Sequence, residues 1–200
     1  MMHASLTAAS LFDDVLEAMG LFSPPPRSFF RDVLNECLTR LYTELVCESH
    51  TQTLSVNGQY LPYESLHSPT GTPVRREDIL AVYADERQAR HLRADLHGLA
   101  SDAEKENFFA TDEGGVCLAL PAATLRVRFL LRPPLCTEEN EASYAIPLYA
   151  EFMPLLRARL LGEGYKEAGE DALAAKWLAE YNHALDGFAA YLATRKVKEG

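Results

Sequence analysis

The strongest constraint on the fold is a long apolar stripe in residues 27–48. Apolar side chains recur there as adjacent pairs every four residues, which is the spacing of one buried face on an α-helix. The pairs begin with Phe29 and Phe30 and end with Leu45 and Val46. Charged residues occupy the other positions, so we expect one amphipathic helix over residues 27–48 that buries this face. Asn35 lies beside the stripe and is a candidate for fixing the register of the helix.

Helical spacing also precedes this segment. We predict a helix over residues 6–19 that ends at Gly20, because glycine tolerates the left-handed conformation of a helix C-cap. The prolines at 24–26 then break the chain and can start the next helix.

Two more helices are predicted near the C-terminus, over residues 147–161 and 168–194. Pro147 suits a first helical turn, and Gly162 and Gly164 are expected to close the first of these helices. The residues after Thr194 are expected to form a frayed basic tail that contains Arg195, Lys196 and Lys198.

The middle of the chain has a β pattern instead. Apolar residues alternate with Arg126 and Arg128, which is typical of a strand with one wet face. We leave residues 85–107 open, as a loop with a short strand or a helical turn. The remaining β signals are a tight turn at Asn57-Gly58, a loop over 68–73, a strand over 78–83 and a hairpin around 112–115.

These elements define the expected fold class, which is α+β. We expect a helical bundle built from N- and C-terminal helices with an inserted small antiparallel β module. Residues 1–50 would give the first helices of the bundle, residues 51–137 the β-rich module, and residues 138–200 the last helices and tail.

Composition narrows the function classes. The formal net charge is −10, which argues against a surface that wraps a phosphate backbone. No apolar run approaches the ~20 residues that a membrane span needs. The four cysteines show no CxxC spacing, so we expect reduced thiols, mostly buried.

No pattern of catalytic residues stands out. We find no phosphate-binding glycine loop, nucleophile elbow or helical zinc motif, and therefore expect no enzyme activity, no cofactor and no metal. His91 and His97 could share a metal, although two solvated histidines are the simpler interpretation. Glu138, Glu139 and Glu141 could bind Ca²⁺, but they lack an EF-hand pattern and suit a solvated loop. Trp177 and Tyr181 suit packing between helices better than a ligand platform.

The order of four segments resembles the head-to-tail adaptor (neck or connector) proteins of tailed bacteriophages. The first is an early helix with the sequence FRDVLNECL at 30–38, followed by a β region. A strand then leads into proline and threonine at 127–137 (VRFLLRPPLCT). Ile146-Pro147 follows, and the closing helices contain AAKWLAEY at 174–181.

The resemblance implies a structural subunit of the phage neck, assembled in the host cytoplasm and carried in the virion. Its expected partners are the portal protein, tail or nozzle proteins and further copies of itself in a ring, usually a dodecamer. Genomic DNA would pass through the channel without sequence-specific binding, and no membrane would be involved. The basic tail with Arg195, Lys196 and Lys198 would grip the portal.

Two other functions stay open at this point. One is a non-catalytic protein-binding module of another virion or regulatory assembly, which would recognise its partner through the β region. The other is an enzyme, for which the sequence offers no motif.

Overall fold

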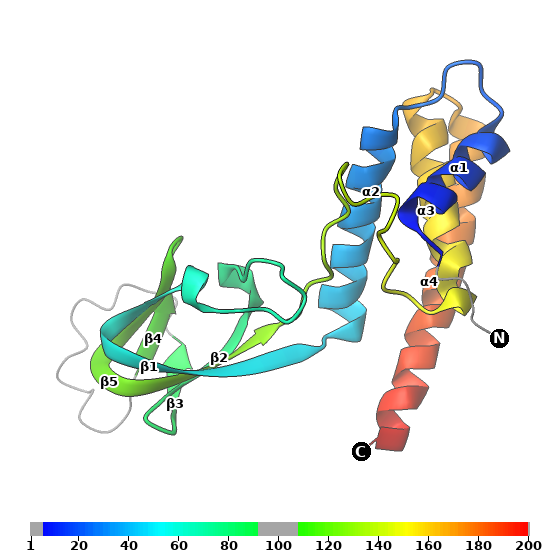
Figure 1. Ribbon diagram of the computed structural model, residues 1–200. Helices are drawn as coiled ribbons and strands as arrows, with labels where there is room; N and C mark the ends of the chain where they lie inside the picture. The colour runs from blue at the N-terminus through cyan, green and yellow to red at the C-terminus, as the bar shows by residue number, and fades with distance from the viewer. Residues whose placement is uncertain (1–5, 92–107, 200) are drawn as a thin grey trace. The chain divides into compact units, whose positions relative to one another are not determined.

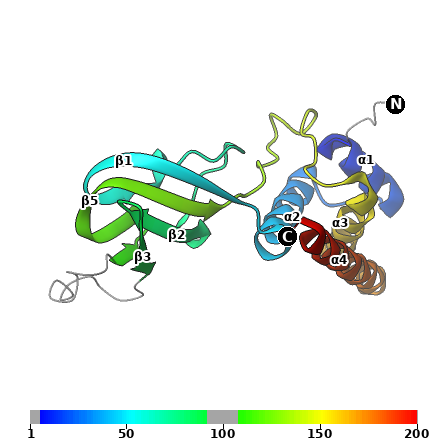
Figure 2. The same ribbon diagram turned by 90° about the horizontal axis from the view of Figure 1, so that it is seen from below.

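The computed structural model describes residues 6–91 and 108–199, without the side chains of Asn57 and of residues 195–199. The chain divides into two compact units, and the first two views show both (Figures 1 and 2). Met1–Val46 and Leu135–Gly200 make up the helical unit. Cys47–Pro134 make up the barrel unit.

Helix α1, Ala8–Met19, has both ends capped. The Thr7 hydroxyl accepts a hydrogen bond from the Ser10 amide at 3.3 Å, and Gly20 adopts a left-handed conformation with φ of +58°. Both caps satisfy backbone groups that a helix end leaves unpaired. The prediction of a helix that ends at Gly20 is confirmed.

Helix α2 spans Arg27–Arg40 and continues as a π-helical turn over Leu41–Val46. One helical rod over nearly all of residues 27–48 is therefore confirmed, with a change of helical type near its end. The apolar stripe is buried as expected, and its members Phe30, Leu34 and Leu38 are fully inaccessible to solvent.

Helices α3, Met153–Glu167, and α4, Asp171–Glu199, complete the helical unit. The prediction that Gly162 and Gly164 close a helix is wrong, because both lie inside α3 and are buried. A Cβ atom on Gly162 would lie 2.8 Å from the side chain of Leu178 on α4, and one on Gly164 would lie 2.9 Å from Phe30. These glycines therefore permit close helix packing. Pro147 precedes the helix, which begins with Pro154 in its first turn.

The barrel unit holds five strands among its described residues: β1 Ser49–Pro62, β2 Ile79–Ala84, β3 Arg87–His91, β4 Phe108–Thr111 and β5 Gly115–Leu130. Strand β5 is long enough to pair with β2 near its end and with β4 near its start. Strands β2 and β3 form a hairpin, and β3 pairs in parallel with β4. Strand β1 runs along the remaining edge of β5.

The expected fold class is wrong in its β part. The pairings β5–β2–β3–β4–β5 close a four-stranded barrel with β1 as an additional strand, so the protein is not a helical bundle with a small inserted antiparallel sheet. One pairing is parallel, and the barrel encloses a core of its own around Val82, Val127 and Phe129. Closure gives β4 a second partner and so removes the edge that it would expose in an open sheet; β1 keeps an outer edge without a partner among the described strands.

The tight turn expected at Asn57-Gly58 is also wrong. Strand β1 continues through both residues, and the register against β5 shifts on either side of Gly58, whose φ is +146°. Glycine therefore serves a bulge here, which lets β1 follow the bend of β5. By contrast, the hairpin around 112–115 and the strand over 78–83 are confirmed. Of the open segment 85–107, residues 87–91 form β3, and residues 92–107 lie outside the described part.

Candidate functional site

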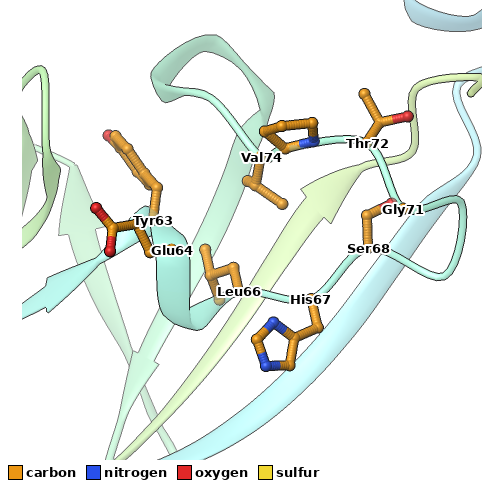
Figure 3. Close-up of a pocket in the computed structure, with 9 residues that line it drawn as sticks. Tyr63, Glu64, Leu66, His67, Ser68, Gly71, Thr72 and Val74 are labelled. Carbon is orange, nitrogen blue, oxygen red and sulfur yellow. The ribbon is translucent and has the colours of Figure 1, made fainter. Parts of the chain in front are cut away.

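A pocket of about 480 Å³ opens in the loop between β1 and β2 of the barrel unit (Figure 3). It is lined by Tyr63, Glu64, Leu66, His67, Ser68, Gly71, Thr72, Pro73 and Val74. Strand β1 holds this loop through Gln52, which accepts the amide proton of His67 at 2.7 Å. Thr72 donates to the Pro133 carbonyl at 2.9 Å.

The polar side chains of this pocket do not form a nucleophile–base pair. The Ser68 hydroxyl bonds to the Thr70 hydroxyl at 2.7 Å, whereas Figure 3 shows the His67 ring apart from it. Tyr63 donates to the Asp112 carbonyl, and burial together with the nearby Asp112 carboxylate raises the pKa of its phenol to about 12. These contacts fix the conformation of the loop and leave the pocket walls mostly apolar.

In the helical unit, Asn35 holds the extended segment that follows the barrel. Its side-chain amide donates to the Cys136 carbonyl and accepts from the Cys136 amide, both at 2.9 Å. The Asn35 side chain thus bonds to the backbone of Cys136 as a neighbouring β-strand would, with one donated and one accepted hydrogen bond. Asn35 was flagged as a candidate for fixing helix register, and the structure shows instead that it fixes a segment about 100 residues away in the chain.

The acidic cluster at 138–141 is anchored as well. Glu141 accepts from Arg27 at 2.5 Å and from Arg31 at 3.0 Å, and its side chain is 12% exposed. Of the two earlier interpretations, a calcium loop or a solvated loop, neither describes Glu141, since its carboxylate is neutralised by α2. Glu138 and Glu139 remain exposed.

Aromatic side chains join α3 and α4. The guanidinium of Arg157 lies 5.6 Å from the centre of the Trp177 ring, and that of Arg159 lies 5.3 Å from the Tyr181 ring. Tyr181 also contacts the thiol of Cys37 at 3.9 Å, and burial raises the pKa of that thiol to about 11. Trp177 and Tyr181 therefore serve packing between helices, as expected.

No described residue covers the side chain of Phe22. Phe22, in the loop between α1 and α2, is fully exposed, and the prolines at 24–26 follow it. Sequence periodicity did not single it out, because a lone phenylalanine between two helices carries no pattern. A large apolar side chain held in water on a proline-stiffened loop is a candidate contact for a partner.

The basic residues assigned to portal binding lie at the end of α4. The helix continues to Glu199, past the expected end at Thr194, so the backbone of Arg195, Lys196 and Lys198 is helical. Their side chains lie outside the described part of the structure.

Metal and membrane sites find no support in the described ranges. Within residues 6–91 and 108–199 the structure brings together no group of three or more side chains that could hold a metal ion. His91 packs against Phe109 with ring centres 4.8 Å apart, and His97 lies outside the described residues. No described helix combines the length and the apolar character that a membrane crossing requires.

The described residues form fixed loops and side-chain contacts, together with an exposed aromatic residue, and such features are typical of proteins that bind other proteins. Comparison with known protein families identifies the class of protein. Residues 6–197 match the family described as SU10 adaptor protein, and the chain therefore belongs to that family. A comparison with curated proteins gives no significant match.

Membership agrees with the resemblance found in the sequence. The chain is a structural bacteriophage protein with a head-to-tail adaptor role, which places it in the neck of the virion. The role also implies contact with other components of the phage head or tail.

Proposed function

We propose that this adaptor is one subunit of an oligomeric ring that docks on the portal and supports attachment of the tail. DNA passes through the channel of the ring during packaging and ejection. The ring has twelve subunits in this proposal, and the subunits are made in the host cytoplasm before they join the capsid. The match over residues 6–197 favours this function over a binding module from an unrelated assembly.

The length of α4 is the structural observation that supports docking on the portal, in addition to the family match. This helix has 29 residues and α3 has 15. Because α4 runs back along α3, it continues well past Met153, where α3 begins (Figure 1). Phe188 and Tyr191 pack against Phe152, and Leu192 is the last described residue of α4 that packs against the core. The remaining turns form an arm with three basic residues, and such an arm can reach a partner without disturbing the core.

The charge of the chain supports a channel for DNA. Residues 1–46 and 135–200 carry 17 Asp and Glu against 10 Lys and Arg, a formal charge of −7. Walls of this sign repel phosphate groups and let DNA slide without being held. The net charge of −10 for the whole chain agrees with this role.

Mixing the purified protein with portal rings of the same phage tests the proposal. We expect stoichiometric co-elution in gel filtration and an added ring in negative-stain images. Removing residues 195–200, or changing Arg195, Lys196 and Lys198 together to Gln, should abolish co-elution and leave the thermal unfolding unchanged.

Lys176→Gln is the matched control, because Lys176 is an exposed cation on the same helix. This variant should bind the portal like the wild type. A wild-type protein that stays monomeric beside portal rings would contradict the ring and the docking. If the variants at residues 195–200 dock normally, the role of the α4 arm is wrong, but the ring and its docking on the portal still stand.

A further inference from the structure

Ion pairing is distributed unequally between the two units. In the helical unit every arginine with a described side chain, at 27, 31, 40, 157 and 159, forms an ion pair with a carboxylate of that unit. In the barrel unit only Arg132 does so among the described residues, with Glu77 and Asp78. The arginines at 75, 76, 87, 90, 126 and 128 form no ion pair with a described carboxylate. Among the described residues, the arginines of the helical unit are thus all paired, whereas most arginines of the barrel unit are not.

Three of these arginines share one outward face of the barrel. Arg126 and Arg128 alternate with buried residues on β5, so their side chains point outward about 7 Å apart. Arg90 is exposed on β3, which joins the same sheet through β2. We call the outward positions of β1, β5, β2 and β3 the arginine face; they are Ser49, Thr51, Thr53, Ala81, Tyr83, Gln88, Arg90, Arg126 and Arg128.

The arginine face contains no carboxylate, although the whole chain is strongly acidic. Two of its three arginines are also held in position. The guanidinium of Arg126 lies 4.3 Å from the centre of the Tyr83 ring, and Arg128 donates to the Ser49 hydroxyl at 2.9 Å. Prearranged guanidinium groups lose little freedom when they bind an anionic surface, and they match carboxylates in a bidentate geometry.

The complementary surface is at one end of the helical unit. The loop between α1 and α2 and the turn between α3 and α4 meet there (Figure 1), and Tyr165 donates to backbone carbonyls at the end of α1. Glu17, Glu167, Glu170 and Asp171 are exposed at this end, and none forms an ion pair with a described cation. Lys166 adds one positive charge, so the end stays negative. The exposed Phe22 belongs to the same end, which we call the Phe22 end.

We infer that the arginine face of one subunit binds the Phe22 end of the next subunit. This contact joins two different surfaces of the same chain, so its repetition produces a ring when the rotation closes. The carboxylates supply the anionic partners that the arginines lack among the described residues of the barrel, and Phe22 supplies an aromatic anchor for the contact. The inference rests on the proposed ring and names the surfaces that build it.

Charge reversal tests the contact. The face variant carries Arg126→Glu and Arg128→Glu. The end variant carries Phe22→Ser, Glu167→Gln and Glu170→Gln, so the two mutated surfaces do not attract each other. All five side chains are exposed, so both variants should melt like the wild type. Each variant alone should assemble at least about tenfold more weakly than the wild type in analytical ultracentrifugation, with and without portal rings.

Wild-type assembly should also weaken as salt rises, because ions screen the contact. Arg75→Glu with Arg76→Glu is the control of equal charge change outside the face, and it should assemble normally.

An equimolar mixture of the two variants gives the sharpest result. Each variant keeps one intact surface, so the mixture should form one-to-one dimers by native mass spectrometry and stop there. Rings from the face variant, or a mixture that stays monomeric while the wild type assembles, would overturn the inference and leave the proposed function standing. A face variant that forms rings but no longer shifts a labelled DNA duplex would reassign the arginine face to DNA and also overturn it. A wild-type chain that never assembles on the portal would overturn both proposals.

Discussion

At the scale of single residues, Asn35 connects parts of the helical unit that are distant in sequence. Its side chain pairs both with the amide and with the carbonyl of Cys136, a residue about 100 positions away in the chain. The segment that follows is held by backbone bonds as well, since Ala8 donates to the Tyr144 carbonyl at 3.0 Å. Asn35 therefore sets where the chain re-enters the helical unit after the barrel.

We predict that Asn35→Ala lowers the free energy of unfolding by about 2 kcal/mol, because two peptide groups of Cys136 lose their partner. Urea denaturation followed by circular dichroism measures the change. Asn182→Ala is the control on an exposed position of α4, where alanine should have no effect or stabilise slightly. Equal stability of Asn35→Ala and the wild type would show that water replaces the amide without cost.

Two aspartates of the barrel hold turns through backbone amides. Asp85 accepts from the amides of Ala123 and Thr124, and Asp112 accepts from those of Gly114 and Gly115. These bonds favour the charged carboxylates and lower the pKa of both groups below the ordinary value of 3.8.

The lowered pKa predicts a direction for acid unfolding. A carboxyl group whose pKa is lower in the folded state stabilises the fold above the unfolded pKa, and this stabilisation is lost as pH falls below about 3.8. Asp85→Asn with Asp112→Asn should therefore flatten the dependence of unfolding free energy on pH in this acidic range. Glu113→Gln, an exposed neighbour, is the control and should leave the slope closer to that of the wild type. An unchanged slope in the double variant would mean that the two carboxylates titrate alike in both states.

At the scale of elements, the helices were predictable where their own sequence decides them. The stripe in α2 and the cap at Gly20 depend on neighbours within the helix, so periodicity was enough. Gly162 and Gly164 were misassigned because their role depends on Leu178, Phe30 and other residues from outside α3. A glycine that ends a helix and a glycine that admits a second helix look alike in a single sequence.

Glycines on α3 and α4 provide a matched pair of substitutions. Gly187 is exposed on α4, and a Cβ atom there would meet nothing within 4 Å. Gly187→Ala should raise the free energy of unfolding by about 1 kcal/mol, since alanine restricts the unfolded chain. Gly162→Ala should lower it by about 1–3 kcal/mol, because the added methyl group pushes against Leu178. Thermal melts of both variants measure the sign, and stabilisation by Gly162→Ala would contradict the close packing of α3 on α4.

At the scale of the whole molecule, the two units differ in how far sequence patterns could describe them. Alternation of Arg126 and Arg128 with buried residues correctly indicated a strand with one wet face. The hairpin at 112–115 correctly indicated that β4 pairs with the start of β5. No pattern showed that this strand continues to Arg126 and Arg128, or that β3 pairs with β4 and closes the barrel. The arginine face was hidden for the same reason, since its members come from four strands whose register only the structure provides.

We predict that residues 47–134 fold without the rest of the chain. The barrel has its own buried core, and its first and last strands are paired at Ser49 and Leu130, so the excised fragment keeps both the core and this pairing. The isolated fragment should give a cooperative thermal transition and dispersed amide signals in NMR spectra. A fragment that melts gradually would mean that the barrel requires the helical unit, and Val127→Asp, at a fully buried position, is the control that should abolish the transition.

The pairing of β1 with the end of β5 also bears on the order of folding during synthesis. Helices α1 and α2 leave the ribosome long before α3 and α4. They contact each other through Phe12 and Phe30, but the parts of their apolar faces that pack on α3 have no partner until α3 emerges. The Leu131 amide bonds to the Glu48 carbonyl at 2.8 Å, so a folded barrel brings the two ends of the inserted segment together. Closing an unstructured loop of that length would cost about 4 kcal/mol. A barrel that folds first removes this entropic cost, and the helical unit can then assemble as if its two halves were adjacent in the chain.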